Sequence, residues 1–228
     1  MKLLAVDTST EACSAALYIN GTITERYELA PREHTKLILP MVDSLMTEAM
    51  IEAQDLDALA FGRGPGSFTG VRIATGVIQG IAFAANSLVV PVSTLAAIAQ
   101  DCIENTKNNC VFTAVDARMN EIYWAVYRRN PENIVELSGL ESVGPVANID
   151  CLELKGFGVG SGWKIHETEL TNHLANSVTN YDSNYLPKAS VIARLGVHGF
   201  NNNQAIPVEQ AMPVYLRDKV AKKESERV

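Results

Sequence analysis

The segment best suited to chemistry is a glycine-rich stretch at residues 62–72, with the sequence Gly-Arg-Gly-Pro-Gly-Ser-Phe-Thr-Gly-Val-Arg. Its glycines permit positive φ angles and a close approach to the backbone, and its amides lie just before a predicted helix, where an anion or phosphate binds well. Gly64, Gly66 and Ser67 are the candidate contacts. No Gly-Lys-Ser/Thr closes the stretch, so it is not a P-loop. A tight turn whose glycines serve only packing explains the pattern equally well.

A second candidate is the triplet Asp7, Thr8 and Ser9, which ends the first predicted strand. Ligands of open α/β sheets gather at the carboxyl ends of strands, where an aspartate can hold a metal-bound water and hydroxyls can cradle a phosphate. An Asx-type turn accounts for the triplet more simply. In the second half of the chain, Asp116 and Arg118 stand in the corresponding place without the hydroxyls, and we expect them to form a structural ion pair.

Patterns typical of metal sites and of hydrolases are absent from the sequence. The chain has no HxxxH pair, no GxSxG elbow and no CxxC pair. We therefore predict no catalytic residue and no metal site. We interpret the histidines as structural or solvent-exposed and the cysteines as reduced; they are His34, His166, His173, His198, Cys13, Cys102, Cys110 and Cys151.

The composition is that of a folded, acidic protein. The 228 residues are 47% hydrophobic and carry a formal net charge of −7. No apolar run reaches the roughly 20 residues of a membrane span, and no signal peptide is recognisable, so we expect a cytoplasmic protein without membrane contact. Because RNA binding depends on cationic side chains that displace counterions, we expect any contact with RNA to depend on a partner.

The first half of the chain predicts the order β-β-β-α-β-α-β-α. A turn at Asn20 and Gly21 indicates a hairpin within a three-strand meander, and apolar residues at helical spacing mark the first helix. The expected elements are strands at 3–6, 12–19 and 22–29, a helix at 34–50, a strand at 56–61, a helix at 71–85, a strand at 88–92 and a helix at 93–103.

The second half starts as the first one does. When the two halves of the sequence are aligned so that Asp7 falls on Asp116, Tyr18 falls on Tyr127. This repetition predicts an internal duplication into two lobes, residues 1–103 and 110–228. Its expected elements are strands at 111–115 and 121–129, a strand and glycine turn at 156–162, helices at 164–174 and 189–199, and a last segment, about 207–220, that packs back on the first lobe.

Several of these segments together resemble the bacterial TsaB (YeaZ) family: residues 5–10, 62–72, 116–119 with 121–123, and 213–217. The glycine-rich segment is the most specific, and the resemblance covers essentially the whole chain. It implies a two-lobed, duplicated α/β fold of the actin/Hsp70-like (ASKHA) type. It also implies a complex with a TsaD-like catalytic subunit and a TsaE-like ATPase that forms N6-threonylcarbamoyladenosine at position 37 of tRNA.

The resemblance further implies a pseudoenzyme that acts as a scaffold or activating subunit. TsaD, the catalytic paralogue, carries a metal-binding HxxxH pair on the helix after the strand that is 88–92 here. Thr94 and Ile98 hold those two positions in this sequence, and neither binds a transition metal usefully. Two alternatives stay open: an M22-type glycoprotease-like or vestigial ATPase activity, and an independent small-molecule sensor. No cofactor is required on the main interpretation, with weak ATP or ADP binding at the two loops as the remaining option.

Two predicted helices offer a partner surface. Small residues recur every four positions on the helix at 71–85, so a neighbouring backbone can come close; that neighbour is either the lobe's own sheet or another chain. The helix at 34–50 has more apolar positions than one core contact requires. In the TsaB family these helices pair with TsaD or, in its absence, with a second TsaB copy. The resemblance thus implies a homodimer when the chain is alone and an interface at Leu37, Met41, Leu45, Ile73, Gly76, Val77, Gly80 and Ala84.

Overall fold

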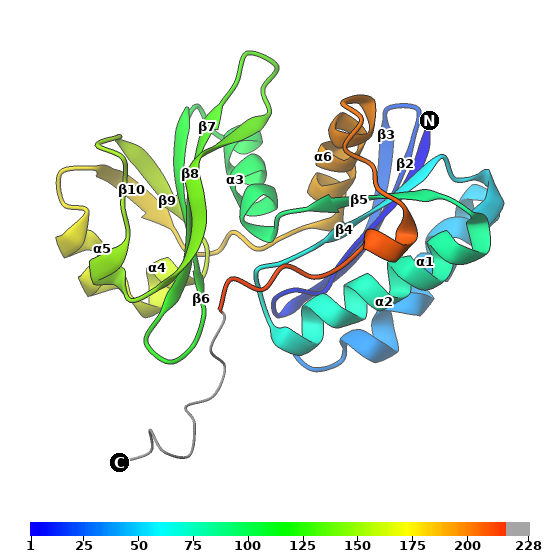
Figure 1. Cartoon of the computed structure of the whole chain (residues 1–228), viewed down its shortest axis with the longest axis horizontal. Helices are drawn as coiled ribbons and strands as arrows, with labels where there is room; N and C mark the ends of the chain where they lie inside the picture. Colours follow the sequence, from blue (N-terminus) through cyan, green and yellow to red (C-terminus); the bar gives the residue numbers. More distant parts are fainter. Residues whose placement is uncertain (218–228) are drawn as a thin grey trace.

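Two five-stranded sheets lie side by side and define two lobes (Figure 1). This computed structural model describes residues 1–217 of the chain. The first sheet begins with the predicted meander, in which Asn20 and Gly21, both at positive φ, turn the chain between its second and third strands. In the order β3-β2-β1-β4-β5, this sheet holds β1 (Lys2–Asp7), β2 (Ala12–Ile19), β3 (Thr22–Leu29), β4 (Ala58–Gly62) and β5 (Leu88–Val92), with β4 parallel to β1 and β5 parallel to β4.

The second sheet repeats the first, which confirms the predicted duplication and fold class. Its strand order, β8-β7-β6-β9-β10, matches β3-β2-β1-β4-β5 strand for strand. The predicted alignment is wrong by one residue in the second strand, because Leu3 pairs with Tyr18 whereas Phe112 pairs with Val126 rather than Tyr127. The strands are β6 (Cys110–Asp116), β7 (Ile122–Arg129), β8 (Val135–Gly144), β9 (Gly156–Val159) and β10 (Val178–Asp182).

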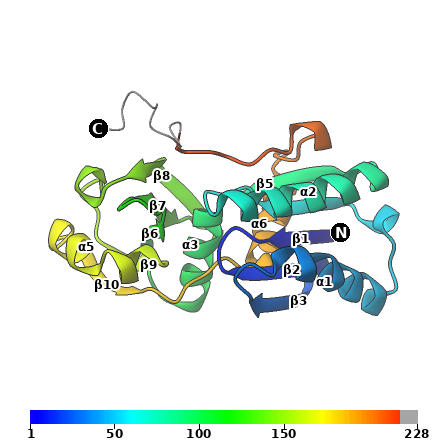
Figure 2. The ribbon, with the colours of Figure 1, turned by 90° about the horizontal axis from the view of Figure 1, so that it is seen from below.

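Helices cover both faces of each sheet. The first sheet lies between α1 and α2 on one face and α6 on the other, and the second lies between α3 on one face and α4 with α5 on the other (Figures 1 and 2). The helices are α1 (His34–Ala49), α2 (Phe68–Ala85), α3 (Thr94–Asn105), α4 (Gly162–Ile165), α5 (Glu167–His173) and α6 (Ala189–Asn201), with three short 3-10 helices at Ala53–Asp55, Val146–Asn148 and Val208–Gln210.

The predicted boundaries 1–103 and 110–228 do not separate the lobes in space. Helix α3 follows the first sheet in the chain but buries Leu95, Ile98 and Ile103 against the second sheet. Helix α6 follows the second sheet but buries Val191 and Ile192 against the first. Because each half of the chain lends one helix to the other lobe, neither sheet keeps both faces covered without the whole chain.

The end of the described chain ties the two lobes together. We call residues 205–217 the C-terminal strap. Ile206 bridges to Val89 of β5, and the Val214 amide donates to the carbonyl of Arg63 at 2.8 Å. The strap therefore returns to the first lobe as far as Tyr215, whose ring lies beside that of Phe68, and positions 218–220 of the predicted segment lie outside the described residues. In Figure 1 the strap, in red, then crosses to the loop between β6 and β7.

Helix α2 is the most apolar helix of the described chain. By length and composition it could cross a membrane, with a mean hydropathy of 1.3. It packs on the first sheet through Ala74, Ile78 and Ala82. The absence of a membrane span stays a prediction.

Candidate functional site

The triplet after β1 is a closed turn. The Asp7 carboxylate accepts hydrogen bonds from the Ser9 amide at 3.0 Å and from the Ser9 hydroxyl at 2.9 Å. The Thr8 hydroxyl donates to the carbonyl of Gly70 at 2.6 Å. All three side chains are fully buried. Their polar atoms thus face other parts of the protein, as the Asx-turn interpretation expects.

The Asp7 carboxylate lies against the backbone of β4. A Cβ atom on Gly62 would stand 1.8 Å from Asp7 Oδ2, so only glycine leaves room for this carboxylate. Burial raises the pKa of Asp7 to about 6, and the hydrogen bonds from Ser9 lower it in part. The Asp7 carboxylate is therefore fully buried, and its hydrogen-bond partner is Ser9.

The glycine loop closes over the same turn. The Ser67 amide donates to the Ser9 carbonyl at 2.7 Å, and a Cβ atom on Gly66 would lie 2.4 Å from that carbonyl. A Cβ on Gly70 would lie 2.0 Å from the Thr8 carbonyl. These glycines therefore permit loop-to-loop packing, which is the alternative that the sequence left open. The loop occupies the approach to Asp7, Thr8 and Ser9.

Of the six residues predicted to hold a nucleotide, Ser9, Gly66 and Ser67 line the cleft between the lobes, and the other three do not. Gly64 is buried beneath the strap at a φ of +94°. A Cβ atom on Gly64 would lie 3.3 Å from the carbonyl oxygen of Val214. Ser67 is exposed and caps α2, since its side chain accepts from the Gly70 amide at 3.4 Å. Helix α2 thus begins at Phe68, three residues before the predicted start. The two loops lie against each other, and the contacts of the glycine loop with this turn are loop-to-loop contacts.

The corresponding turn in the second lobe is an ion-pair cluster, as predicted. Asp116 and Arg118 are 3.1 Å apart, and the Arg118 amide donates to the same carboxylate. The strap adds Arg217, which donates to the carbonyl of Ala117 at 3.0 Å and pairs with Glu121. This link between the strap and the second lobe fixes one side of the cleft between the lobes.

A buried polar cluster that the sequence did not reveal joins the lobes on the other side. Glu141 of β8 pairs with Arg63 of the glycine-rich segment at 3.0 Å, and Tyr127 donates to its carboxylate at 2.8 Å. The Ser93 hydroxyl, at the start of α3, also donates to Glu141. Burial and the neighbouring carboxylate raise the pKa of Tyr127 well above its usual value, so Tyr127 stays a donor.

Two further ion pairs connect α6 with α3. Lys188 lies 2.9 Å from Asp101, and Arg194 lies 2.6 Å from Glu104. Together with the pairs of Arg63 and Arg217, they place each cation on the first lobe or its strap and each anion on the second. Opposite charges thus hold the lobes at one relative position.

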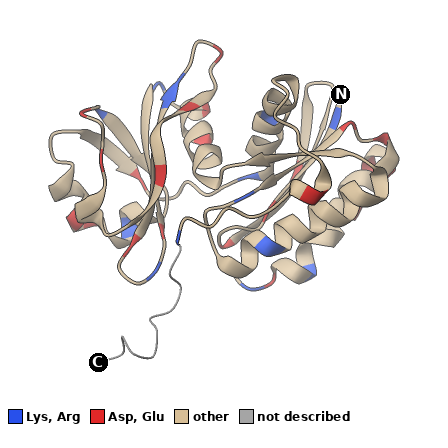
Figure 3. Cartoon of the chain, viewed as in Figure 1, with Lys and Arg blue, Asp and Glu red and all other residues tan. Residues whose placement is uncertain are grey.

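The predicted partner surface lies on α1 and α2. A Cβ atom built on Gly76 or Gly80 meets no other atom within 4 Å, and Ala84 is exposed. The small-residue face of α2 therefore points away from its own sheet, and the alternative in which the sheet is its neighbour is wrong. Arg72 is the one charged residue of α2, and the ribbon of α2 in Figure 3 is tan over most of its length.

The remaining interface predictions divide between surface and core. Leu37, Met41, Ile73 and Val77 are half-buried. Leu45 is only 1% exposed and belongs to the core between α1 and the sheet, so its assignment to the interface is wrong. The sequence prediction also missed exposed apolar side chains on the same two helices, Leu39 and Phe83.

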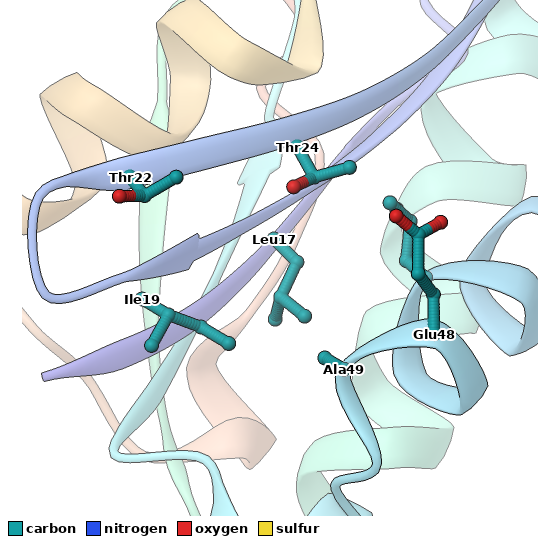
Figure 4. Close-up of a pocket in the computed structure, with 7 residues that line it drawn as sticks. Leu17, Ile19, Thr22, Thr24, Glu48 and Ala49 are labelled. Carbon is teal, nitrogen blue, oxygen red and sulfur yellow. The ribbon is translucent and has the colours of Figure 1, made fainter.

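A small pocket of about 210 Å³ lies between the β2–β3 hairpin and the end of α1 (Figure 4). Leu17 and Ile19 form its apolar side, Thr22 and Thr24 face them from β3, and Glu48 stands at α1. None of the predicted nucleotide contacts lines it.

Within residues 1–217, no group of three or more His, Cys, Asp or Glu side chains is arranged to hold a metal ion. Thr94 and Ile98 are both fully buried. The Thr94 hydroxyl donates to the Ser9 hydroxyl at 3.2 Å, and Ile98 packs in the core of the second lobe.

Comparisons of the sequence and of the structure with known proteins point to the same group of relatives. Residues 22–225 match the family model described as "TsaD: tRNA N6-adenosine threonylcarbamoyltransferase". The tRNA threonylcarbamoyladenosine biosynthesis protein TsaB of Escherichia coli K12 is 40% identical over 97% of this chain and 96% of its own length. Its namesake from Haemophilus influenzae is 39% identical over 96% of this chain and 95% of its own length. The solved structure of YeaZ from Pseudomonas aeruginosa has a TM-score of 0.85 at 39% identity and covers 94% of this chain and 99% of its own.

Proposed function

Because the chain belongs to the TsaB (YeaZ) family, we propose that it is a non-catalytic scaffold subunit for a TsaD-like enzyme that forms N6-threonylcarbamoyladenosine at position 37 of tRNA. The observation that carries this proposal is the free small-residue face of α2. Gly76 and Gly80 cost helix stability and fill no packing need within the chain. These glycines would allow the backbone of a second chain to pack closely on this face of α2.

The apolar side chains around this face suit a protein partner. Phe83 of α2, one turn from Gly80, is more than half exposed, and half-buried Met41 of α1 can adapt its shape to related surfaces. A two-fold or pseudo-two-fold axis through Gly76 and Gly80 would join two pairs of helices into a bundle. The partner is TsaD in the complex and a second copy of this chain when TsaD is absent.

The buried residues support a subunit without its own catalysis. Ile98 has no ligand atom, and Asp7 is enclosed by Ser9 and the glycine loop, so the protease alternative lacks a metal ligand at Ile98 and the ATPase alternative lacks an accessible acid at Asp7. No cofactor is required in this role. The ATPase of the complex is a TsaE-like subunit, tRNA is bound through the complex, and the protein works in the cytoplasm.

The experiment replaces Gly80 by leucine. The larger side chain should overpack the interface and weaken association with a TsaD-like subunit, and with a second copy, by about 1–3 kcal/mol, or about 5- to 150-fold in Kd. Sedimentation of the chain alone and of its mixture with TsaD measures both.

Gly144→Leu is the matched control, because Gly144 of the second lobe also has open space around its Cβ position. The proposal fails if Gly80→Leu and Gly144→Leu associate as the wild type does. Metal analysis of the purified protein distinguishes the scaffold from the protease alternative. Stoichiometric zinc or iron would favour a protease.

A further inference from the structure

Two of the four free cysteines lie on the same face of the second sheet. Cys110 begins β6, and Cys151 lies in the segment between β8 and β9. Both are partly exposed, and both pack against the apolar cluster that α4 and α5 cover. Cys13 and Cys102, by contrast, are fully buried in two other clusters. The two thiols that solvent can reach are therefore gathered in one part of the second lobe.

Both of these thiols lie at the start of β9. A Cβ atom on Gly156, the first residue of β9, would stand 3.1 Å from the Cys110 sulfur. The Gly156 amide donates to the Ser177 carbonyl at 2.9 Å, and the Ser177 hydroxyl lies 3.2 Å from the Cys151 sulfur. Because Gly156 has no side chain, it leaves room beside the Cys110 sulfur on the side of Ser177 and Cys151.

The segment that carries Cys151 is fixed on both sides of it. Trp124 of β7 donates its indole N–H to the carbonyl of Asp150 at 2.9 Å. The Leu154 amide donates to the Cys151 carbonyl at 3.0 Å, across a turn whose two central residues both have a φ of +56°. These contacts hold Cys151 beside the sheet, so little further ordering is needed before its sulfur meets a second thiol.

The ionisation of the two thiols differs. Burial raises the pKa of the Cys110 thiol, the cation of Arg128 lowers it in part, and the neighbouring Cys151 raises it further. The influence of Cys151 on Cys110 is that of a nearby group. Because the thiolate is the nucleophilic form of cysteine, we expect Cys151 to react before Cys110.

We propose that Cys110 and Cys151 are a redox-sensitive pair, which a low-molecular-weight disulfide such as oxidised glutathione converts into a disulfide bond. The Cys151 thiolate attacks one sulfur of oxidised glutathione, breaks its S–S bond and releases one glutathione. Cys110 then loses its proton and attacks the Cys151 sulfur of the mixed disulfide, which releases the second glutathione. The protein thiols give up two electrons and two protons, and the two glutathione molecules take them up.

The test incubates the native, full-length chain with oxidised glutathione and maps its unreduced peptides by mass spectrometry. We expect one linkage, between Cys110 and Cys151, while Cys13 and Cys102 stay free. The bond closes a long loop that contains β7 and β8, so the melting temperature should rise by about 5 °C or more. Dithiothreitol should reverse the shift.

Variants separate the two steps of the reaction. Cys110→Ser should stop at the mixed disulfide, with one glutathione on Cys151. Cys102→Ala is the matched control and should form the bond as the wild type does. The proposal is overturned if the native wild type leaves both thiols free, if Cys110 and Cys151 each carry a glutathione without becoming linked, or if the linkage fails to raise the melting temperature.

The result is independent of the scaffold proposal. The pair lies in the second lobe, whereas α1 and α2 cover the first sheet. The reduced and oxidised forms should therefore sediment alike, and Gly80→Leu should form the bond as readily as the wild type.

Discussion

Alanine at Gly70 and alanine at Gly80 should change stability in opposite directions, although both residues lie on α2. A methyl group on Gly70 would stand 2.0 Å from the Thr8 carbonyl, which the end of β1 and the Thr8–Gly70 hydrogen bond hold in place. The backbone shift that relieves this clash should lower the free energy of unfolding by about 1–3 kcal/mol, and by about 1 kcal/mol more if the Thr8–Gly70 hydrogen bond is lost. A methyl group on Gly80 meets nothing, so the gain in helix propensity should stabilise the monomer by about 0.5–1 kcal/mol.

Urea unfolding at low protein concentration, where the chain is monomeric, measures both effects. The midpoint for Gly70→Ala should fall and that for Gly80→Ala should rise, with the free energies of unfolding of the two variants separated by roughly 1.5–5 kcal/mol. If Gly70→Ala is as stable as the wild type, the glycine loop does not pack on the turn as described. If Gly80→Ala destabilises the monomer, the face of α2 is covered within the chain and the argument for a partner there loses its basis.

Three further outcomes follow from the charged residues. The pKa of Asp7 is about 6 in the folded protein and 3.8 when unperturbed, so the folded state holds the extra proton between these values. The wild type should therefore lose up to about 3 kcal/mol of stability as the pH rises from about 4 to 7, and Asp7→Asn, measured in parallel unfolding titrations, should show no such loss. Glu141→Gln removes the charge that pairs with Arg63, so thermal unfolding should show a loss of about 1–3 kcal/mol; an unchanged melting temperature would mean that the cluster does not hold the lobes together. With a net charge of −7, the lone chain should show no tight, salt-dependent tRNA binding in gel-shift titrations, and such binding would contradict the expected dependence on partners.

Some elements could be predicted because their signals are local. The turn at Asn20 and Gly21 marks the β2–β3 hairpin, and the apolar period of 34–50 marks α1. The sequence pattern did not predict strand β8, because it is an edge strand with an exposed face and charged residues. Its pairing with β7 is also irregular in register near Gly139, which has a φ of +82°. Its neighbours in space, and not its composition, make it a strand. β10, at the other edge of the same sheet, was missed as well.

The sequence by itself determined the family, the start of the internal repeat and the glycine spacing of α2. Those features depend on residue types at short separations. Only the tertiary structure decided that α3 and α6 exchange lobes, that Glu141 meets Arg63 across 78 residues, and that the glycine loop seals Asp7 instead of opening to a ligand. The same glycine permits both a phosphate contact and a close backbone contact, because the absence of a Cβ atom creates space without specifying what fills it. What fills that space is set by the packing of distant segments, and at Gly66 and Gly70 it is the backbone of Ser9 and Thr8.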